Sequence, residues 1–246
     1  MAIRHLSASA ISDFRECPML HIGRRVERWP ESKPPYMAHA MALGRVVHAG
    51  LEAHHKGQDA IQALCQVWST EGAELPSHYF AKALGMLRCY VEFERHDPRD
   101  QQERKFVLNI PGVSVPIIGY IDLQRGLTVR EYKTTGSATW WTQKRADESI
   151  QGSLYSMAVS SENHGAQVEV EFHILSHRNN QFGHEILRTS RTKAQLEECR
   201  DGIIQTWTEM QQEPRVARCA PGRCRFPEHC KNYGYGGVDS EELVLD

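Results

Sequence analysis

Residues 119–133, GYIDLQRGLTVREYK, carry the pattern that decides the fold. An apolar, β-rich segment runs up to Leu123, residues 124–126 are typical of a turn, and residues 127–133 have the composition of a returning strand. The sequence therefore predicts an antiparallel β-hairpin at this point of the chain.

The predicted hairpin places charged side chains on one face. If residues 125–126 form the turn, Asp122 lies opposite Val129 and diagonal to Glu131, roughly 7–8 Å away at the backbone. Lys133 shares the face of Glu131, because alternate residues of a strand point to the same side. Two acids and a lysine at a strand end are costly unless they hold a metal or a substrate.

The remaining segments predict an α/β fold. We expect helices over 7–28 (in two parts), 37–56, 59–70, 78–96, 148–161 and 192–211, and strands over 106–110, 113–123, 127–133, 168–175 and 183–187. Residues 134–147 are expected to form a polar loop. This order predicts a single domain over 1–246. It is mainly helical over 1–100, has a mixed central sheet flanked by helices in a core over 101–212, and ends in a cysteine-rich tail over 213–246.

Composition limits the possible functions. The 246 residues include 29 Lys and Arg and 31 Asp and Glu, which gives a formal net charge of −2. A protein that merely coats nucleic acid is usually basic overall, so any nucleic-acid binding must be local, through a basic groove or a metal that offsets acidic residues. The sequence has no apolar run of membrane-spanning length and no apolar secretion segment at its N-terminus. We therefore expect a cytoplasmic protein without membrane association.

The acidic hairpin suits chemistry on a phosphodiester. Carboxylates that hold Mg²⁺ or Mn²⁺ attract a phosphodiester, and the metal polarises a phosphoryl oxygen and lowers the pKa of bound water. Lys133 can position that water, help to deprotonate it and neutralise charge in the transition state. When the pattern from Asp122 to Lys133 is taken alone, a solvated salt bridge at a strand end is the simpler explanation.

Two further motifs change this balance. Gln151 and Tyr155 are four residues apart on an expected helix, and therefore lie on one face. His48 follows Gly44 in the segment GRVVH of another expected helix. Each motif by itself fits an ordinary helix surface or core.

Taken in order, these motifs resemble those of the RecB-type branch of the PD-(D/E)xK nucleases. The opening LSASAISDFRECP (6–18) is similar to that family's N-terminal segment, and GRVVH, GYID, EYK and QGSLY are similar to its histidine, acidic, ExK and Q-x-x-x-Y motifs. The resemblance covers nearly the whole chain and implies a restriction-endonuclease-like core.

The resemblance also implies roles for single residues. The implied ligands of Mg²⁺ or Mn²⁺ are His48, Asp122, Glu131 and the carbonyl group of Tyr132. The implied catalytic residues are Asp122, Glu131 and Lys133, with Gln151 and Tyr155 lining the site and orienting the lysine or the DNA strand. Glu103 lies where relatives often carry a further acid.

The seven cysteines favour a reducing compartment over a disulfide framework. Cys219, Cys224 and Cys230 are spaced as in metal sites. The resemblance extends to an iron–sulfur subgroup that includes CRISPR-adaptation and AddB-type nucleases, and it implies Cys17 as the fourth ligand of a 4Fe–4S cluster. A zinc site with the same four cysteines, or unligated thiols, are the alternatives. The cysteines expected to be buried within helices are Cys65, Cys89 and Cys199.

Aromatic and basic residues follow the predicted strand of Lys133. Trp140, Trp141, Lys144 and Arg145 suit either a wall of a DNA channel, where aromatic rings stack on bases, or a solvated loop. Arg24, Arg25 and Arg28 form a basic run that suits a solvated face or phosphate contacts.

Together these features predict a divalent-metal-dependent deoxyribonuclease. We expect an exonuclease that acts on DNA ends or single strands in recombination, phage DNA processing or CRISPR adaptation, with protein partners in those processes, in a bacterial, archaeal or phage-infected cell. The alternatives are a nucleic-acid-binding subunit of the same fold that does not cut, and a zinc-stabilised interaction protein.

Overall fold

The structure is a computed structural model that describes residues 3–32, 35–72, 75–137, 140–178, 181–212 and 225–232. It contains two compact units. The helical unit comprises Met1–Lys33, Val107–Gly119 and Ala194–Asp246, and the sheet unit comprises Pro34–Phe106 and Tyr120–Lys193. We describe each unit by itself.

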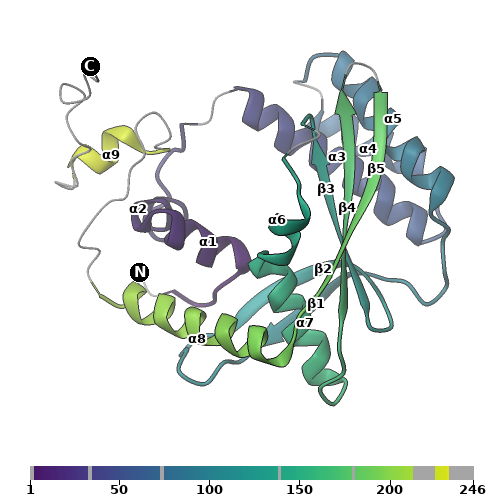
Figure 1. Cartoon of the computed structure of the whole chain (residues 1–246). Helices are drawn as coiled ribbons and strands as arrows, with labels where there is room; N and C mark the ends of the chain where they lie inside the picture. The colour runs from purple at the N-terminus through teal and green to yellow at the C-terminus, as the bar shows by residue number, and fades with distance from the viewer. Residues whose placement is uncertain are drawn as a thin grey trace, which may run out of the picture. The chain divides into compact units, whose positions relative to one another are not determined.

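A mixed five-stranded sheet organises the fold (Figure 1). Its strands, in spatial order, are β1 (Gln101–Leu108), β2 (Ile117–Arg125), β3 (Thr128–Thr135), β4 (Glu169–Arg178) and β5 (Gln181–Ser190). β2 and β3 pair antiparallel, β3 and β4 parallel, and β4 and β5 antiparallel. The predicted α/β fold with a mixed central sheet is therefore confirmed.

The predicted turn of the β2–β3 hairpin is displaced by one residue, which shifts the pairing of the two strands by two residues. Gln124 pairs with Val129 and Arg125 with Thr128, so the two-residue turn is formed by Gly126 and the leucine after it. Gly126 has a φ of 61°, and a glycine with positive φ at the first position of a two-residue turn matches the twist of a hairpin. Asp122 therefore does not lie opposite Val129.

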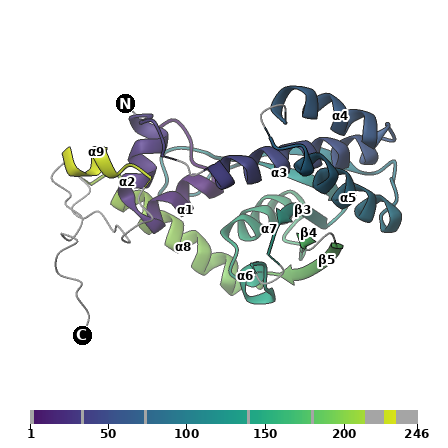
Figure 2. The same ribbon diagram turned by 90° about the horizontal axis from the view of Figure 1, so that it is seen from above.

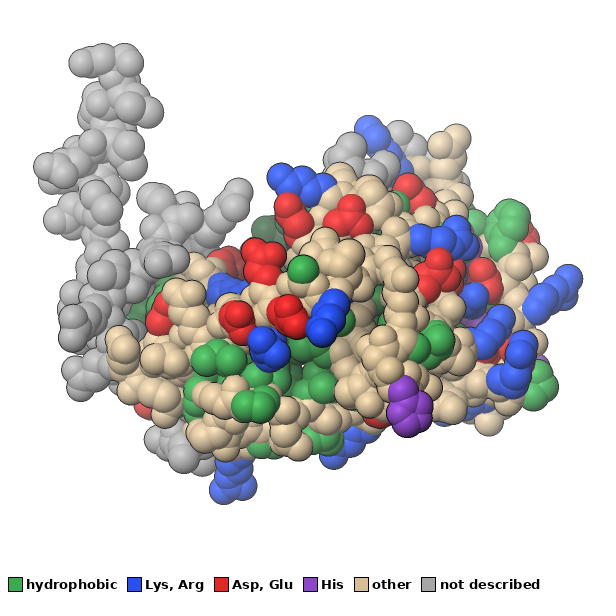
Figure 3. All heavy atoms as spheres, turned by 60° about the horizontal axis from the view of Figure 1, so that its bottom comes forward, with side chains coloured by type: hydrophobic (Ala, Val, Ile, Leu, Met, Phe, Trp, Pro, Cys, Tyr) green, Lys and Arg blue, Asp and Glu red, His purple; other side chains and the backbone are tan. Residues whose placement is uncertain are grey.

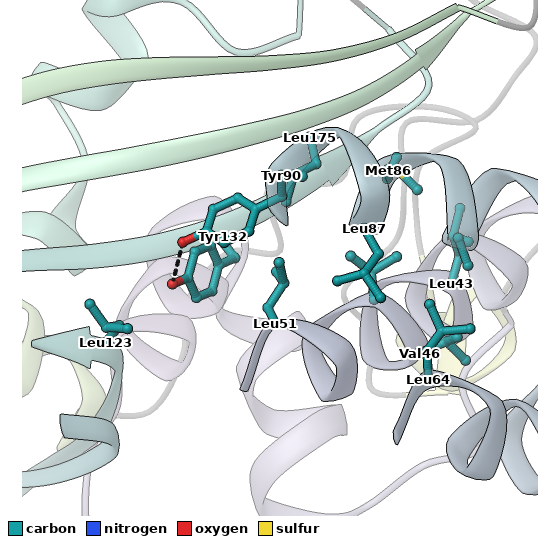
Figure 4. Close-up of a cluster of buried hydrophobic side chains, with 12 residues drawn as sticks. Leu43, Val46, Leu51, Leu64, Met86, Leu87, Tyr90, Leu123, Tyr132 and Leu175 are labelled. Carbon is teal, nitrogen blue, oxygen red and sulfur yellow. Dashed lines mark hydrogen bonds between the residues drawn. The ribbon is translucent and has the colours of Figure 1, made fainter. Parts of the chain in front are cut away.

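Helices α3 (Pro35–His55), α4 (Ala60–Glu71) and α5 (His78–Phe93) pack together beside β3 and β4. Figure 4 shows the core between them, which consists of Leu43, Val46, Leu51, Leu64, Met86, Leu87, Tyr90, Leu123, Tyr132 and Leu175 with two further buried residues. The hydroxyl oxygens of Tyr90 and Tyr132 are 3.0 Å apart, so the two buried phenols satisfy each other. This core fixes α3 against β3, which positions the site described below.

Helices cover both faces of the sheet (Figure 2). Phe172 stacks on Trp141 and approaches Gly152 of α7 (Ile150–Glu162), whereas the next residue, His173, contacts Tyr90 of α5. Neighbouring side chains of β4 thus pack against helices on opposite faces of the sheet, as the pleat of a strand requires.

The expected polar loop over 134–147 contains a short helix, α6 (Gln143–Asp147). The Thr142 hydroxyl accepts a hydrogen bond from the Arg145 amide at 3.2 Å, which is an N-cap. Five residues are too few to show a helical period, so the pattern of the sequence did not reveal this element.

The helical unit contains α1 (Ala8–Glu16), α2 (Pro18–His21), the π-helical turn η1 (Ile22–Val26), most of α8 (Lys193–Met210) and α9 (Pro227–Asn232). Ser7 caps α1, and Pro18 begins α2 at a position where proline costs no helical hydrogen bond. Trp29 packs edge-on against Phe226, with ring centroids 5.5 Å apart. Of the helices described in both units, none is long and apolar enough to span a membrane.

Candidate active site

Glu131 and Lys133 form the centre of a hydrogen-bonded cluster in the sheet unit. The Lys133 Nζ donates to Glu131 Oε1 at 2.6 Å and to Gln151 Oε1 at 3.1 Å. Both residues lie on β3, and Gln151 lies on α7, which covers this face of the sheet. Glu131 is only 4% exposed, so its carboxylate depends on these partners for its solvation.

Tyr155 closes the cluster from the second turn of α7. Its hydroxyl oxygen is 2.6 Å from Glu131 Oε2 and 2.7 Å from the Tyr120 carbonyl oxygen, and it accepts a hydrogen bond from Gln151 Nε2 at 2.7 Å. Burial raises the pKa of Tyr155 well above its ordinary value, so the phenol keeps its proton for one of these two acceptors. The predicted pair of Gln151 and Tyr155 therefore holds both the lysine and the glutamate in place.

Asp122 lies where β2 leaves β3. The strand pairing ends with Leu123 and Arg130. Beyond this pair, the Tyr132 amide donates its hydrogen bond to Asp122 Oδ2, at 2.8 Å, instead of to the backbone of β2. Burial, and after it the Glu131 carboxylate, raises the pKa of the Asp122 carboxyl well above its ordinary value. Two nearly buried carboxylates that resist sharing negative charge form a site that a cation would stabilise.

His48 of α3 reaches the same carboxylate. Its Nδ1 is 3.9 Å from Asp122 Oδ2, and its Nε2 is 3.1 Å from the Tyr132 carbonyl oxygen. Burial lowers the pKa of His48, so the ring is neutral near pH 7 and can offer a lone pair.

Glu103 of β1 completes a candidate metal group. One ligand atom each from His48, Glu103 and Asp122 lie within 4.8 Å of one another, and the three residues line the same small hollow. Glu103 is exposed as a whole residue, yet the surroundings of its carboxyl group raise its pKa, first by desolvation and then by repulsion from Glu52. One imidazole nitrogen and two carboxylates are donors that suit Mn²⁺, and the oxygen donors also suit Mg²⁺, so these residues fit a divalent cation.

The structure thus brings the predicted site residues of the sheet unit together, but one acidic residue in the candidate metal group differs from the prediction. Glu131, Lys133, Gln151 and Tyr155 form one hydrogen-bonded network. His48 and Asp122 both contact the backbone of Tyr132, which lies between Glu131 and Lys133 on β3. Glu103 joins His48 and Asp122 more closely than the sequence indicated, whereas the Glu131 side chain bonds to Lys133 and Tyr155. Glu103 was hard to place because β1 begins at Gln101, before the apolar alternation that marks the strand in the sequence. Its positive φ of 47° is also invisible in a pattern.

The aromatic and basic residues after β3 lie next to Lys133. The Lys133 Nζ is 5.7 Å from the centre of the Trp141 ring, and the Arg145 guanidinium is 4.4 Å from the Trp140 ring. Trp140 is 58% exposed, while Lys144 points into solvent beside Glu148. The arrangement offers an exposed indole and cations beside the lysine, and their contact with DNA stays a prediction.

The predicted cluster cysteines lie largely outside the described residues. Cys219 and Cys224 belong to the undescribed segment, and of Cys230 only the backbone position in α9 is described. Cys17 lies between α1 and α2 and is half-buried. Of the three cysteines expected to be buried, Cys65 is exposed, because α4 turns the neighbouring Leu64 toward the core; Cys89 and Cys199 are half-buried.

Comparisons with known proteins identify the family of the chain and support its fold. The profile of the PD-(D/E)XK nuclease superfamily matches residues 5–231. A crystal structure from Eubacterium rectale, described as that of a candidate exonuclease, has a similar fold, with a TM-score of 0.59 and 15% sequence identity over 93% of this chain and 88% of that one. The solved structure of SSO0001 covers 75% of this chain and 89% of its own at 14% identity, with a TM-score of only 0.32. Comparison with curated proteins gave no match. The family profile spans nearly the whole sequence, and the chain belongs to the PD-(D/E)XK nuclease superfamily.

Proposed function

We propose that this nuclease is a Mg²⁺- or Mn²⁺-dependent deoxyribonuclease that works as an exonuclease on DNA ends or single strands. The observation that carries the proposal is the nearly buried pair of Asp122 and Glu131 beside Lys133. A nucleic-acid-binding subunit that does not cut has no need of this costly arrangement, and neither does a zinc-stabilised interaction protein.

The residues that would hold the metal are His48, Asp122 and Glu103, with Glu131 and the Tyr132 carbonyl in reach of the same position. Each carboxylate oxygen has more than one lone pair, so Glu131 can bond Lys133 and Tyr155 and still contribute to a cation. When bound, a divalent metal polarises the scissile phosphate and activates a water molecule.

Lys133 and its partners supply the rest of the chemistry. Glu131 and Gln151 hold the ammonium group, which can orient the attacking water and neutralise negative charge that develops on the phosphate. Tyr155 holds Glu131 from the other side, so the lysine and the carboxylate keep a fixed spacing during the reaction. Trp140 and Arg145 are the proposed contacts for the bases and phosphates of the strand.

We also propose that Cys17, Cys219, Cys224 and Cys230 hold a 4Fe–4S cluster, with zinc as the second candidate. The support is the spacing of the cysteines in the sequence and the resemblance of the sequence motifs to those of an iron–sulfur subgroup of nucleases. Work in recombination, phage DNA processing or CRISPR adaptation is part of the same proposal.

A cleavage assay on defined substrates tests the activity. DNA labelled at the 5′ or the 3′ end, as single or double strands, is incubated with Mg²⁺ or Mn²⁺, and closed circular single-stranded DNA is run in parallel. An exonuclease shortens the linear strands progressively from one end and leaves the circle intact. Cleavage of the circle would contradict exonuclease action, and cleavage that persists fully in a chelator would contradict metal dependence.

A further inference from the structure

A basic pocket lies in the helical unit and plays no part in the catalytic proposal. Its volume is about 390 Å³, within the range of small-ligand sites. Arg4, Arg24, Arg25 and Arg28 line it together with His21, and none of the described residues that line it is acidic.

The arginines leave a surplus of positive charge. Arg24 is 2.6 Å from Asp13 and also pairs with Glu31, and Arg25 is 3.3 Å from Asp13, so two acids outside the pocket offset these two arginines. Within the described part of the chain, Arg4 and Arg28 form no ion pair. Two uncommitted guanidinium groups suit a doubly charged anion.

His21 adds an unsatisfied polar atom. The residue is 3% exposed, and its Nδ1 lies 3.1 Å from the Ala10 carbonyl oxygen, which can only accept, so Nδ1 carries the proton. Burial lowers the pKa of His21, and the ring is therefore neutral, with a lone pair on Nε2. That Nε2 is buried and has no hydrogen-bond partner among the described residues. Because solvent does not reach this nitrogen, a ligand in the open pocket is recognised by the arginines and not by His21.

The backbone around the pocket is unusual at the same place. Arg24 and Arg25 lie on the π-helical turn η1, a feature that is frequent at functional sites. Arg28 follows with a φ of 55°, in the left-handed region that favours glycine. A glycine would adopt this backbone angle without strain, whereas Arg28 adopts it at a conformational cost.

We propose that this pocket binds a phosphate monoester. With a second pKa of about 6, a monoester carries close to two negative charges near pH 7, one for each of Arg4 and Arg28. An internal phosphodiester has only a single negative charge. No Phe, Tyr or Trp lies among the described residues that line the pocket, so it recognises the phosphate and not a stacked base. If the nuclease proposal holds, on which this part rests, the monoester is the terminal phosphate of a nucleic-acid strand.

Binding of end-modified oligonucleotides to the full chain tests the proposal. Single strands with a 5′-phosphate, a 3′-phosphate or only hydroxyl ends are titrated by fluorescence anisotropy without added Mg²⁺ or Mn²⁺, so that no cleavage is required. We expect one phosphorylated end to bind about tenfold more tightly than the hydroxyl control. Arg4→Gln and Arg28→Gly should each remove this preference, while Arg200→Gln, which removes a surface arginine with a local partner in the same unit, should keep it.

The Arg28→Gly variant separates binding from folding. Glycine relieves the positive φ, so its Tm should equal or exceed that of the wild type while its preference for phosphate is lost. Equal affinity for phosphate and hydroxyl ends in the wild type would overturn the proposal, and so would a preference that survives both variants. If inorganic phosphate and nucleoside monophosphates bind through these arginines while strand ends show no preference, the assignment to nucleic acid is overturned. A protein that prefers phosphate ends but never cleaves DNA would refute the nuclease proposal and leave the pocket assignment standing.

Discussion

At the scale of single residues, Asp122 carries a charge that the metal-free protein poorly accommodates. Burial and Glu131 raise its pKa, while the Tyr132 amide and Lys133 only partly compensate. The folded state therefore binds a proton at Asp122 more tightly than the unfolded state does. By linkage, its contribution is unfavourable above the folded pKa and vanishes below the unfolded value of about 3.8.

We therefore predict that Asp122→Asn stabilises the metal-free protein at pH 7 while it abolishes cleavage. The asparagine Oδ1 can still accept the Tyr132 amide hydrogen bond, so only the charge is lost. Thermal unfolding with a chelator should give a higher Tm for the variant at pH 7 and converging values toward pH 4. Mn²⁺ should raise the Tm of the wild type but not that of the variant. A lower Tm for the variant at pH 7 without metal would show that the charge of Asp122 does not destabilise the metal-free protein.

Tyr155 acts at the same scale by holding Glu131. Tyr155→Phe removes one hydroxyl and leaves a nearly buried carboxylate oxygen without that partner, which costs about 1–3 kcal/mol of stability. We expect cleavage to slow by about tenfold or more, because Glu131, which holds the Lys133 ammonium group, is itself no longer held in place by Tyr155. The matched control is Tyr36→Phe, at an exposed tyrosine of α3. Equal rates for Tyr155→Phe and the control would remove Tyr155 from the positioning of the site.

At the scale of elements, the β2–β3 hairpin depends on one backbone angle. Gly126 has a φ of 61° and no heavy atom within 4 Å of where a Cβ would lie, so a substitution there changes conformation without a clash. We predict that Gly126→Ala destabilises the fold by about 1–2 kcal/mol. Gly126→Asn should cost less, because asparagine tolerates positive φ. Denaturant unfolding of the three proteins measures this, and equal stability of wild type and Gly126→Ala would contradict the assigned turn.

The same hairpin shows how far the sequence predicts this structure. Apolar periodicity was sufficient to identify most of the elements and the shared face of Glu131 and Lys133. The turn was predicted one residue too early, and the pairing was therefore shifted by two residues, because the position of the turn follows from the φ of Gly126 rather than from side-chain alternation. The place of Glu103 could not be predicted either, since it depends on where β1 lies beside α3 and not on local pattern.

At the scale of the whole molecule, charge gives no general attraction to DNA. The formal net charge is −2, and acidic and basic side chains are interspersed on the face drawn in Figure 3. Binding must therefore arise from local groups, such as the cations beside Trp140, and should weaken as salt rises.

The proposed cluster also belongs to this scale, because its ligands lie near opposite ends of the sequence. We predict that the anaerobically purified protein is brown and contains iron, and that Cys17→Ser bleaches it and lowers its Tm. Cys65→Ser, at an exposed thiol of α4, should keep both the colour and the Tm. A colourless protein with stoichiometric zinc would replace iron by zinc at the same residues, and colour that survives Cys17→Ser would show that another residue is the fourth ligand.

The proposed catalysis depends on Lys133, whose Nζ lies 2.6 Å from Glu131 Oε1 beside the proposed metal ligands. The decisive experiment is single-turnover cleavage of end-labelled DNA with saturating Mn²⁺ by the wild type, by Lys133→Met and by the matched variant Lys82→Met at a half-buried lysine of α5. We predict that Lys133→Met slows cleavage by about 10²–10⁴-fold while its Tm and DNA affinity stay near those of the wild type, and that Lys82→Met cleaves normally. Cleavage by a folded Lys133→Met protein within about threefold of the wild-type rate would show that Lys133 is not a catalytic residue.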